Sequence, residues 1–367
     1  MWLLGTARAD LIFFPQPEEV PRGYAILSHT WLEADKADTF LKVQKLNPSR
    51  SSPPWFNPRD HLTPKIRSFL ELAEEHGYEY AWVDTCCINK ESSAELSEGI
   101  NSMFRYYALS TICYVYLSDV QYSETDPSDD MWFAFQRSRW HWRGWTLQEL
   151  IASRVLMFYS KEWICLGTKY ELADRLEEAT GISAAVLRFE SPFTDASIAT
   201  RISWAAHRKT TRPEDAAYSL FGLFGVNMPT LYGEGRHAFC RFLMEILKAS
   251  RDPSIILLGK RQYVAGLEDL KSRLRREPQS RTRRHLLPLN PSPTFRTASR
   301  PNPQMLYDPC ARSRRGRNEV RWYGCYSSTL YDIDDYFSTA RLRARPQNSA
   351  LPRSPCRQMG SSSTRPF

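Results

Sequence analysis

Four short apolar runs recur along the first 160 residues of the chain. They are "YAILSHTW" (Tyr24–Trp31), "YAWVDTCCIN" (Tyr80–Asn89), "TICYVYLSDV" (Thr111–Val120) and "RVLMFYS" (Arg154–Ser160). Each is a nearly continuous hydrophobic stretch with polar residues at its end, which is the pattern of a strand buried on both faces of a sheet. We therefore predict four buried strands.

Amphipathic segments separate these runs. Residues 63–77 begin with Pro64 at the first helical position and stop at Gly77, residues 92–110 carry one apolar face, and a helix of about two turns holds Glu149. Because strand and helix alternate, the pattern favours an α/β fold with an open, mainly parallel sheet flanked by helices, as in flavodoxin-like proteins.

Polar side chains follow the predicted strands. Ser28, Asp84, Asp119 and Glu149 all fall near carboxyl ends of strands or just after them. In open α/β sheets ligands bind beyond these ends, so we expect a binding site there.

Beyond residue 160 the pattern changes twice. Residues 169–250 are helical in periodicity, with a stripe that includes Phe239, Phe242 and Leu243, and 11 of the 24 prolines lie beyond Gly259. We divide the chain into an N-terminal extension (1–23), a sheet domain (24–160), a helical extension packed on it (161–258) and a mostly disordered Arg/Pro/Ser-rich tail (259–367).

Charge separates the tail from the rest. Residues 259–367 hold 22 Lys/Arg against 8 Asp/Glu, whereas residues 1–258 hold 27 against 33, so the net charge of +8 belongs to the tail. Arginine-rich segments bind polyanions without sequence specificity, and they are also common as solvated or localising segments.

Several classes of protein are disfavoured. The eight cysteines form no CxxC pair and the seven histidines no HxxxH pair, so we expect free thiols and no metal site. The longest promising uncharged run, Tyr106–Ser118, is too short to span a bilayer, and the first residues lack the basic start of a secretory signal. We expect a cytoplasmic protein without a membrane span.

Three blocks of the sequence resemble a known family. "YAILSHTW", the stretch from "YAWVDTCCINK" to "YVYLSDV", and "RGWTLQELIASRV" are similar in order and spacing to the fungal heterokaryon-incompatibility (HET) domain over residues 24–160. The resemblance implies a role in non-self recognition that triggers growth arrest or programmed cell death. It also implies self-association, or binding to another incompatibility protein.

A more distant similarity suggests a reaction. "GWTLQEL" followed by a strand looks like the Trp-x-x-x-Glu helix of Toll/interleukin-receptor (TIR) domains, whose enzymatic members cleave NAD at the nicotinamide–ribose bond with this glutamate. The resemblance makes Glu149 the catalytic carboxylate and NAD a substrate, with no cofactor. One carboxylate suffices, because it stabilises the oxocarbenium-like ribose while the leaving nicotinamide already carries the positive charge.

Two classes of function remain open at this point. In the first, the protein is a NAD glycohydrolase in which Ser28, Thr30, Asp84 and Trp145 help Glu149 to form the pocket. In the second, it is a non-enzymatic signalling or self-association module. Structural roles for the same residues are also open: Glu149 pairing with Arg143 or Arg154, Trp145 packing, and Asp84 capping the next loop.

Overall fold

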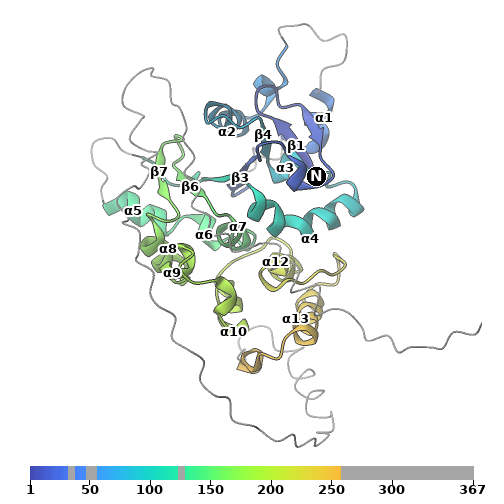
Figure 1. Cartoon of the computed structure of the whole chain (residues 1–367), viewed down its shortest axis with the longest axis vertical. Helices are drawn as coiled ribbons and strands as arrows, with labels where there is room; N and C mark the ends of the chain where they lie inside the picture. The colour runs from blue at the N-terminus through green and yellow to red at the C-terminus, as the bar shows by residue number, and fades with distance from the viewer. Residues whose placement is uncertain (32–37, 47–55, 123–128, 258–367) are drawn as a thin grey trace, which may run out of the picture. The chain divides into compact units, whose positions relative to one another are not determined.

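The computed structural model describes residues 1–31, 38–46, 56–122 and 129–257 (Figure 1). The Arg/Pro/Ser-rich tail, predicted to be mostly disordered, lies outside these residues, and so does most of the acidic loop between Gln121 and Asp130. Within the described ranges, no helix is long and apolar enough to cross a membrane.

Seven strands form one mixed sheet in the order β2-β1-β4-β3-β5-β6-β7. Its four central strands are parallel, as predicted, and the edges are antiparallel. The strands are β1 (Trp2–Gly5), β2 (Leu11–Phe13), β3 (Ala25–His29), β4 (Tyr80–Trp82), β5 (Ile112–Tyr116), β6 (Leu156–Tyr159) and β7 (Cys165–Thr168).

Two of the four parallel strands, β3 and β5, pair over five residues, from Ala25 opposite Ile112 to His29 opposite Tyr116. Every residue of both strands is buried. Burial on both faces explains why these strands read as continuous hydrophobic runs instead of alternating patterns.

Two of the edge strands precede the first predicted strand. β1 and β2 come from "WLLG" and "LIF", and β1 pairs with β4 through Leu4 opposite Ala81. Leu3 and Leu4 are fully buried. The sequence analysis did not predict these strands, because strands of three or four residues are too short to show a periodicity.

The predicted strand Tyr80–Asn89 is partly wrong. The strand ends at Trp82, and Asp84–Cys87 form one helical turn, α3, in which the amides of Cys86 and Cys87 donate to the Val83 carbonyl. A short buried segment is equally hydrophobic as a strand and as a single helical turn, so its composition does not distinguish the two conformations. Cys86 and Cys87 are both free thiols in the core, as expected.

The helices cover the sheet and continue beyond it. They are α1 (Phe40–Leu46), α2 (Pro64–Glu75), α3 (Asp84–Cys87), α4 (Ser93–Leu109), α5 (Asp129–Gln136), α6 (Arg139–Trp142), α7 (Thr146–Ala152), α8 (Ala173–Thr180), α9 (Ala184–Leu187), α10 (Ile198–Ser203), α11 (Asp215–Tyr218), α12 (Phe221–Phe224) and α13 (His237–Ala249). Short 3₁₀ turns lie at Pro17–Glu19, Pro58–His61, Phe193–Asp195 and Pro253–Leu257.

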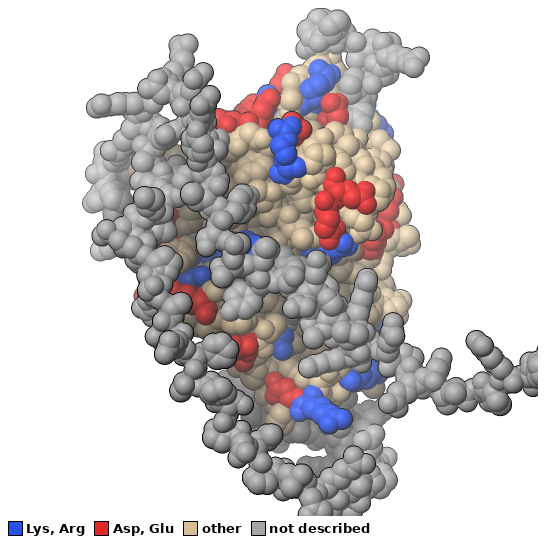
Figure 2. All heavy atoms as spheres, in the orientation of Figure 1, with Lys and Arg blue, Asp and Glu red and all other residues tan. Residues whose placement is uncertain are grey.

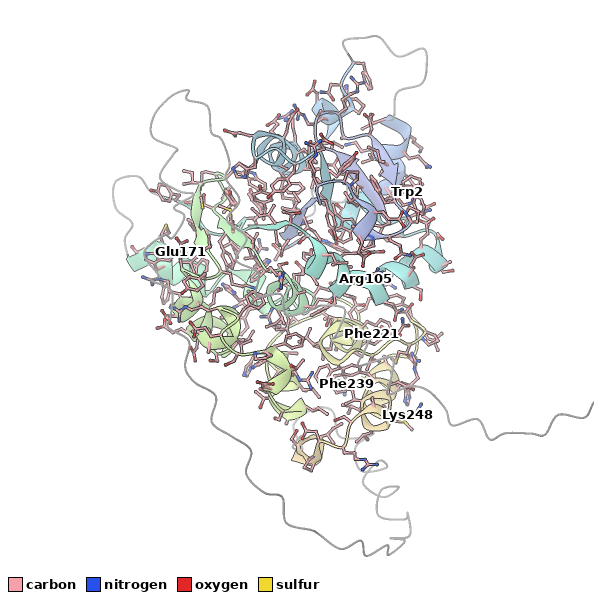
Figure 3. The ribbon with its side chains drawn as sticks, viewed as in Figure 1. Trp2, Arg105, Glu171, Phe221, Phe239 and Lys248 are labelled. Atoms are coloured by element: carbon pink, nitrogen blue, oxygen red, sulfur yellow. The ribbon has the colours of Figure 1, made fainter. Side chains whose placement is uncertain are left out.

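Helices α10 to α13 have an aromatic core of their own. The ring centroid of Phe242, in α13, lies 6.1 Å from that of Phe221 and 5.7 Å from that of Phe239. Figure 3 labels Phe221 and Phe239. On the face shown in Figure 2, basic and acidic side chains intermingle over the described residues.

Helix α12 lies directly against α4 and also contacts α7 (Figure 1). The closest approach is at Gly222, where an added Cβ would come within 2.0 Å of the Phe104 Cβ. Only glycine allows the two helices this separation.

We therefore expect Gly222→Ala to lower the free energy of unfolding by about 1–3 kcal/mol, the usual cost of overpacking a core. Denaturant unfolding of the full chain measures this. Gly5→Ala is the matched control, because a Cβ there meets its nearest atom at an ordinary 3.7 Å. Equal losses of stability in the two variants would contradict the close helix contact.

Candidate functional site

Glu149 lies inside α7 and is nearly covered, with 7% of its surface exposed. Its Oε2 accepts a hydrogen bond from the hydroxyl of Ser28, which is fully buried near the carboxyl end of β3. The carboxylate therefore sits where the sequence analysis expected a site, at the carboxyl end of the central strands, although it is covered instead of open to solvent.

Two further side chains complete a polar cluster around this bond. The indole Nε1 of Trp140 donates to Ser28 Oγ at 2.7 Å. The Tyr107 hydroxyl, from α4, donates a hydrogen bond to the Leu27 carbonyl at 3.1 Å and lies close enough to Glu149 to lower the pKa of that carboxyl. Because the indole donates to Ser28, the serine proton is free to point at the carboxylate.

Burial raises the pKa of Glu149 to about 7. The hydrogen bond from Ser28, the charge of Arg143 and the nearby hydroxyl of Tyr107 each favour the ionised form, while the charge of Asp84 opposes it. Near neutral pH the side chain is therefore present in both protonation states, which suits a group that must respond to charge formed beside it.

A second carboxylate, Asp84, begins α3 and is partly exposed. It accepts a hydrogen bond from the Trp31 indole at 2.9 Å, and its Oδ1 lies 3.8 Å from His29 Nε2. Burial would raise the pKa of Asp84, but the charges of Lys90 and Arg143 and the hydrogen bond from the Trp31 indole lower it. Burial also keeps the pKa of His29 well below its usual value, so the imidazole is neutral.

Trp31, Lys90 and Arg143 form a cationic cluster beside Asp84 that the sequence analysis missed. The Lys90 Nζ lies 3.9 Å, and the Arg143 Cζ 4.6 Å, from the centroid of the Trp31 ring. Trp31 is 48% exposed. The only sequence signal was that Trp31 and Arg143 fall inside "YAILSHTW" and "RGWTLQELIASRV", two of the blocks that resemble the HET domain. The spacing of these residues did not link them to Lys90.

The two remaining predicted site residues lie differently. Thr30 is half-buried just after β3, between His29 and Trp31. Trp145 is the residue that precedes α7, and its side chain hydrogen-bonds to Asp215 at the start of α11. The structure thus brings Glu149, Ser28 and Asp84 to one region, while the Trp145 indole is engaged by the helical residues that follow the sheet.

Two basic residues that follow the sheet hold α7 at its ends. Arg208 Nη1 donates to the Arg143 carbonyl at 3.1 Å and to Thr146 Oγ1 at 2.9 Å, before the first turn. The buried Lys169 ammonium donates to the carbonyls of Leu150, at 3.1 Å, and Ser153, after the last turn. Burial lowers the Lys169 pKa to about 7.

Backbone contacts reinforce the first of these links. The Lys209 amide donates to Trp142, and the Gly144 amide donates to Lys209 at 2.8 Å. A Cβ at Gly144 would lie 2.4 Å from Thr210 Cγ2, so only glycine permits this approach.

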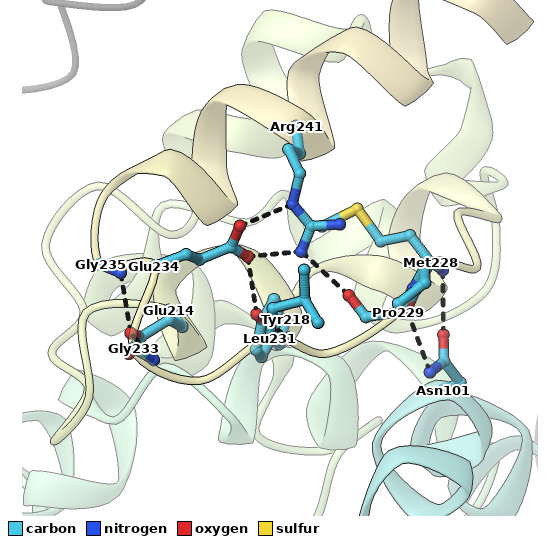
Figure 4. A network of polar contacts seen from close by, with 10 residues as sticks. All are labelled: Asn101, Glu214, Tyr218, Met228, Pro229, Leu231, Gly233, Glu234, Gly235 and Arg241. Carbon is cyan, nitrogen blue, oxygen red and sulfur yellow. Dashed lines mark hydrogen bonds and ion pairs between the residues drawn. The ribbon is translucent and has the colours of Figure 1, made fainter.

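The glycine-containing loop "YGEGR" binds a carboxylate of its own chain. The amides of Gly233 and Gly235 both donate to Glu214 Oε1, at 2.8 and 2.9 Å (Figure 4). Glu234, between them, pairs with Arg241 and accepts from Tyr218. The amides of both loop glycines are therefore occupied by a carboxylate of the chain itself. Among the described residues, no group of three or more His, Cys, Asp or Glu side chains is arranged to hold a metal.

Comparison with known proteins identifies a domain of this chain. Residues 24–132 match the model of the family described as heterokaryon incompatibility protein (HET). Over 235 residues the chain is 42% identical to the vegetative incompatibility protein HET-E-1 of Podospora anserina. The aligned part is 62% of this chain but only 16% of that protein, so the chain spans a small part of its relative's length. No solved structure matches significantly. Residues 24–132 of the chain therefore match the HET domain.

Proposed function

We propose that this chain is an incompatibility effector whose sheet domain hydrolyses the nicotinamide–ribose bond of NAD, with Glu149 as the essential carboxylate. The family match and the similarity to a vegetative incompatibility protein support the biological role. One observation carries the chemistry: a single buried carboxylate that ionises near neutral pH is hydrogen-bonded to Ser28 at the carboxyl end of the parallel strands.

The reaction needs little beyond this carboxylate. As the bond between ribose C1′ and the nicotinamide nitrogen breaks, its electron pair neutralises the pyridinium, and positive charge develops on the ribose. Ionised Glu149 stabilises this charge. Water then adds to C1′ and loses a proton, which gives nicotinamide, ADP-ribose and one released proton.

The neighbouring residues have supporting roles in this proposal. Ser28 holds the carboxylate in one orientation, and Arg143 favours its ionised form. In this proposal, Thr30, just after β3, and Asp84, at the start of α3, bind the ribose hydroxyls. Trp145, bonded to Asp215, steadies the start of α7 instead of stacking on a base.

The alternative is a signalling module whose output comes from self-association or partner binding without catalysis. A specific observation favours it: Glu149 is 7% exposed and its hydrogen bonds are made within the chain, as in a purely structural acid. Catalysis by Glu149 requires that a substrate displace some of this cover, and assembly is a way to achieve it.

We expect the full chain, fused to an oligomerising scaffold, to release nicotinamide from NAD, and we expect Glu149→Gln to reduce the rate by at least about 100-fold. Chromatography of free nicotinamide measures both. In a fungal host, the parent protein should lower NAD and arrest growth, whereas the variant should not.

Glu214→Gln is the matched control, since Glu214 is a comparably buried, hydrogen-bonded glutamate in the residues that follow the sheet. Circular dichroism establishes that each variant is folded. A folded Glu149→Gln protein with full toxicity, or an equal loss of cleavage in the control, would reject the mechanism.

The pKa of Glu149 also predicts how stability depends on pH. The folded protein holds the proton up to about pH 7, whereas the unfolded chain releases it near 4.5. The contribution of Glu149 to the free energy of unfolding is therefore fully present below pH 4.5. It falls by roughly 2–3 kcal/mol as the pH rises to 7. We expect the parent protein to lose stability relative to Glu149→Gln over this range.

Denaturant unfolding of both proteins between pH 4.5 and 7 measures the difference. Measurements should stop at pH 7, because Lys169 has the opposite effect on stability at higher pH. Its pKa is about 7 in the folded protein and 10.5 ordinarily, so its contribution to stability rises between pH 7 and 10.5. Parallel stability curves from pH 4.5 to 7 would show that Glu149 has an ordinary pKa.

A further inference from the structure

We propose that Lys90 and Arg143, held together on the Trp31 ring, form a binding site for the diphosphate group of a nucleotide. The inference rests on the proposed function in taking the ligand to be a dinucleotide such as NAD, but its evidence is separate from Glu149. It assigns the phosphate-binding part of the site to residues from three different segments of the chain.

Within the described residues, two cationic side chains meet at the Trp31 ring beside one ionised carboxylate, Asp84. Neither the Lys90 Nζ nor the Arg143 guanidinium forms a hydrogen bond or an ion pair with any of the described residues; each is held by the Trp31 ring. Among the described residues, Asp84 carries one negative charge against these two positive charges, and both cations lower its pKa. Two cations placed on one ring favour an anion of more than one charge.

The Lys90 and Arg143 side chains are also close enough together to contact one ligand. Both cationic atoms lie close to the same ring centroid, so they are no farther apart than those two distances combined, a span that the oxygens of a diphosphate can bridge. The ring is fixed in turn, because its Nε1 donates to Asp84 Oδ2 at 2.9 Å. The cations are thus oriented before any ligand arrives, which reduces the entropy cost of binding.

The cluster also lies at the edge of the sheet where ligands are expected. Trp31 follows β3 and Lys90 follows the α3 turn after β4, at the carboxyl ends of two neighbouring parallel strands. Arg143, just before α7, is brought to the same place by its contact with the Trp31 ring. Ligands of open α/β sheets bind at this edge. The charge of Arg143 also acts on both Glu149 and Asp84, which places a bound diphosphate within electrostatic reach of the carboxylate.

The backbone of Arg143 is restrained as well. Its carbonyl accepts the hydrogen bond from Arg208, and Arg143 forms a bridge with Lys209. A guanidinium on a fixed backbone offers paired N–H donors to phosphate oxygens, and Lys90 adds a point charge.

The test uses ADP as the probe, since it carries the diphosphate but no nicotinamide bond to cleave. Isothermal titration of the full chain should show ADP binding at least about 10-fold more tightly than adenosine. Lys90→Gln and Arg143→Gln should each weaken ADP binding by about 10-fold, equivalent to one charge-assisted hydrogen bond. Added salt should weaken it further.

Trp31→Leu tests the role of the ring, because it leaves both cations in place but removes their common support. We expect it to weaken ADP binding as much as either single cation variant does. Arg154→Gln is the matched control: it removes an exposed arginine that precedes β6, at the opposite end of the strands, and should leave ADP binding unchanged.

ADP binding that equals adenosine binding, or that persists in the Lys90→Gln/Arg143→Gln double variant, would overturn the proposal. Nicotinamide release is measured separately. If ADP binds as expected and NAD is not cleaved, the diphosphate site stands and the catalytic proposal fails. If NAD is cleaved and its KM is unchanged in both single variants, the catalytic proposal stands and the diphosphate site is rejected.

Discussion

The hydrogen bond between Ser28 and Glu149 is the contact on which the arrangement of this domain depends. It joins the central strand β3 to α7 inside the protein, where an ionisable group is costly to bury without partners. Trp140 and Tyr107 are placed around it so that each polar atom has a partner. Four elements of the fold therefore meet at a single carboxylate, and its pKa is set by how well they enclose it.

The position of α7 also depends on residues far along the chain. α7 has only two turns, too few to be stable alone, and its ends are held by Lys169 and Arg208. These residues lie beyond the range that matches the HET family model, which ends at residue 132. The sheet and the helices after it thus share one structural task, which is to fix Glu149 and Arg143 relative to β3.

The central sheet was predictable because strands such as Ala25–His29 are buried on both faces and read as unbroken apolar runs. The Asp84–Cys87 turn was not, since burial alone does not distinguish one helical turn from a strand. Ser28, Asp84 and Glu149 could be expected at one edge from topology. The contacts of Trp31 with Lys90 and Arg143 join residues about 60 and 110 positions apart, and no local pattern encodes them.

The two proposed parts of the site are complementary in charge to one kind of molecule. A carboxylate alone in the interior prefers to be protonated, and Arg143 is one of the groups that oppose this. An anion bound by Arg143 would offset the positive charge of the guanidinium and raise the pKa of Glu149 further. A simple phosphate would therefore keep the Glu149 carboxyl protonated. A ligand that brings a positive ring together with its diphosphate avoids this penalty, because the cationic end restores the field that favours ionised Glu149. NAD has this charge distribution, and once nicotinamide leaves as a neutral molecule the remaining positive charge is on the ribose beside the carboxylate. In the proposed function, the cationic cluster and the buried acid would therefore select the same substrate for the same electrostatic reason.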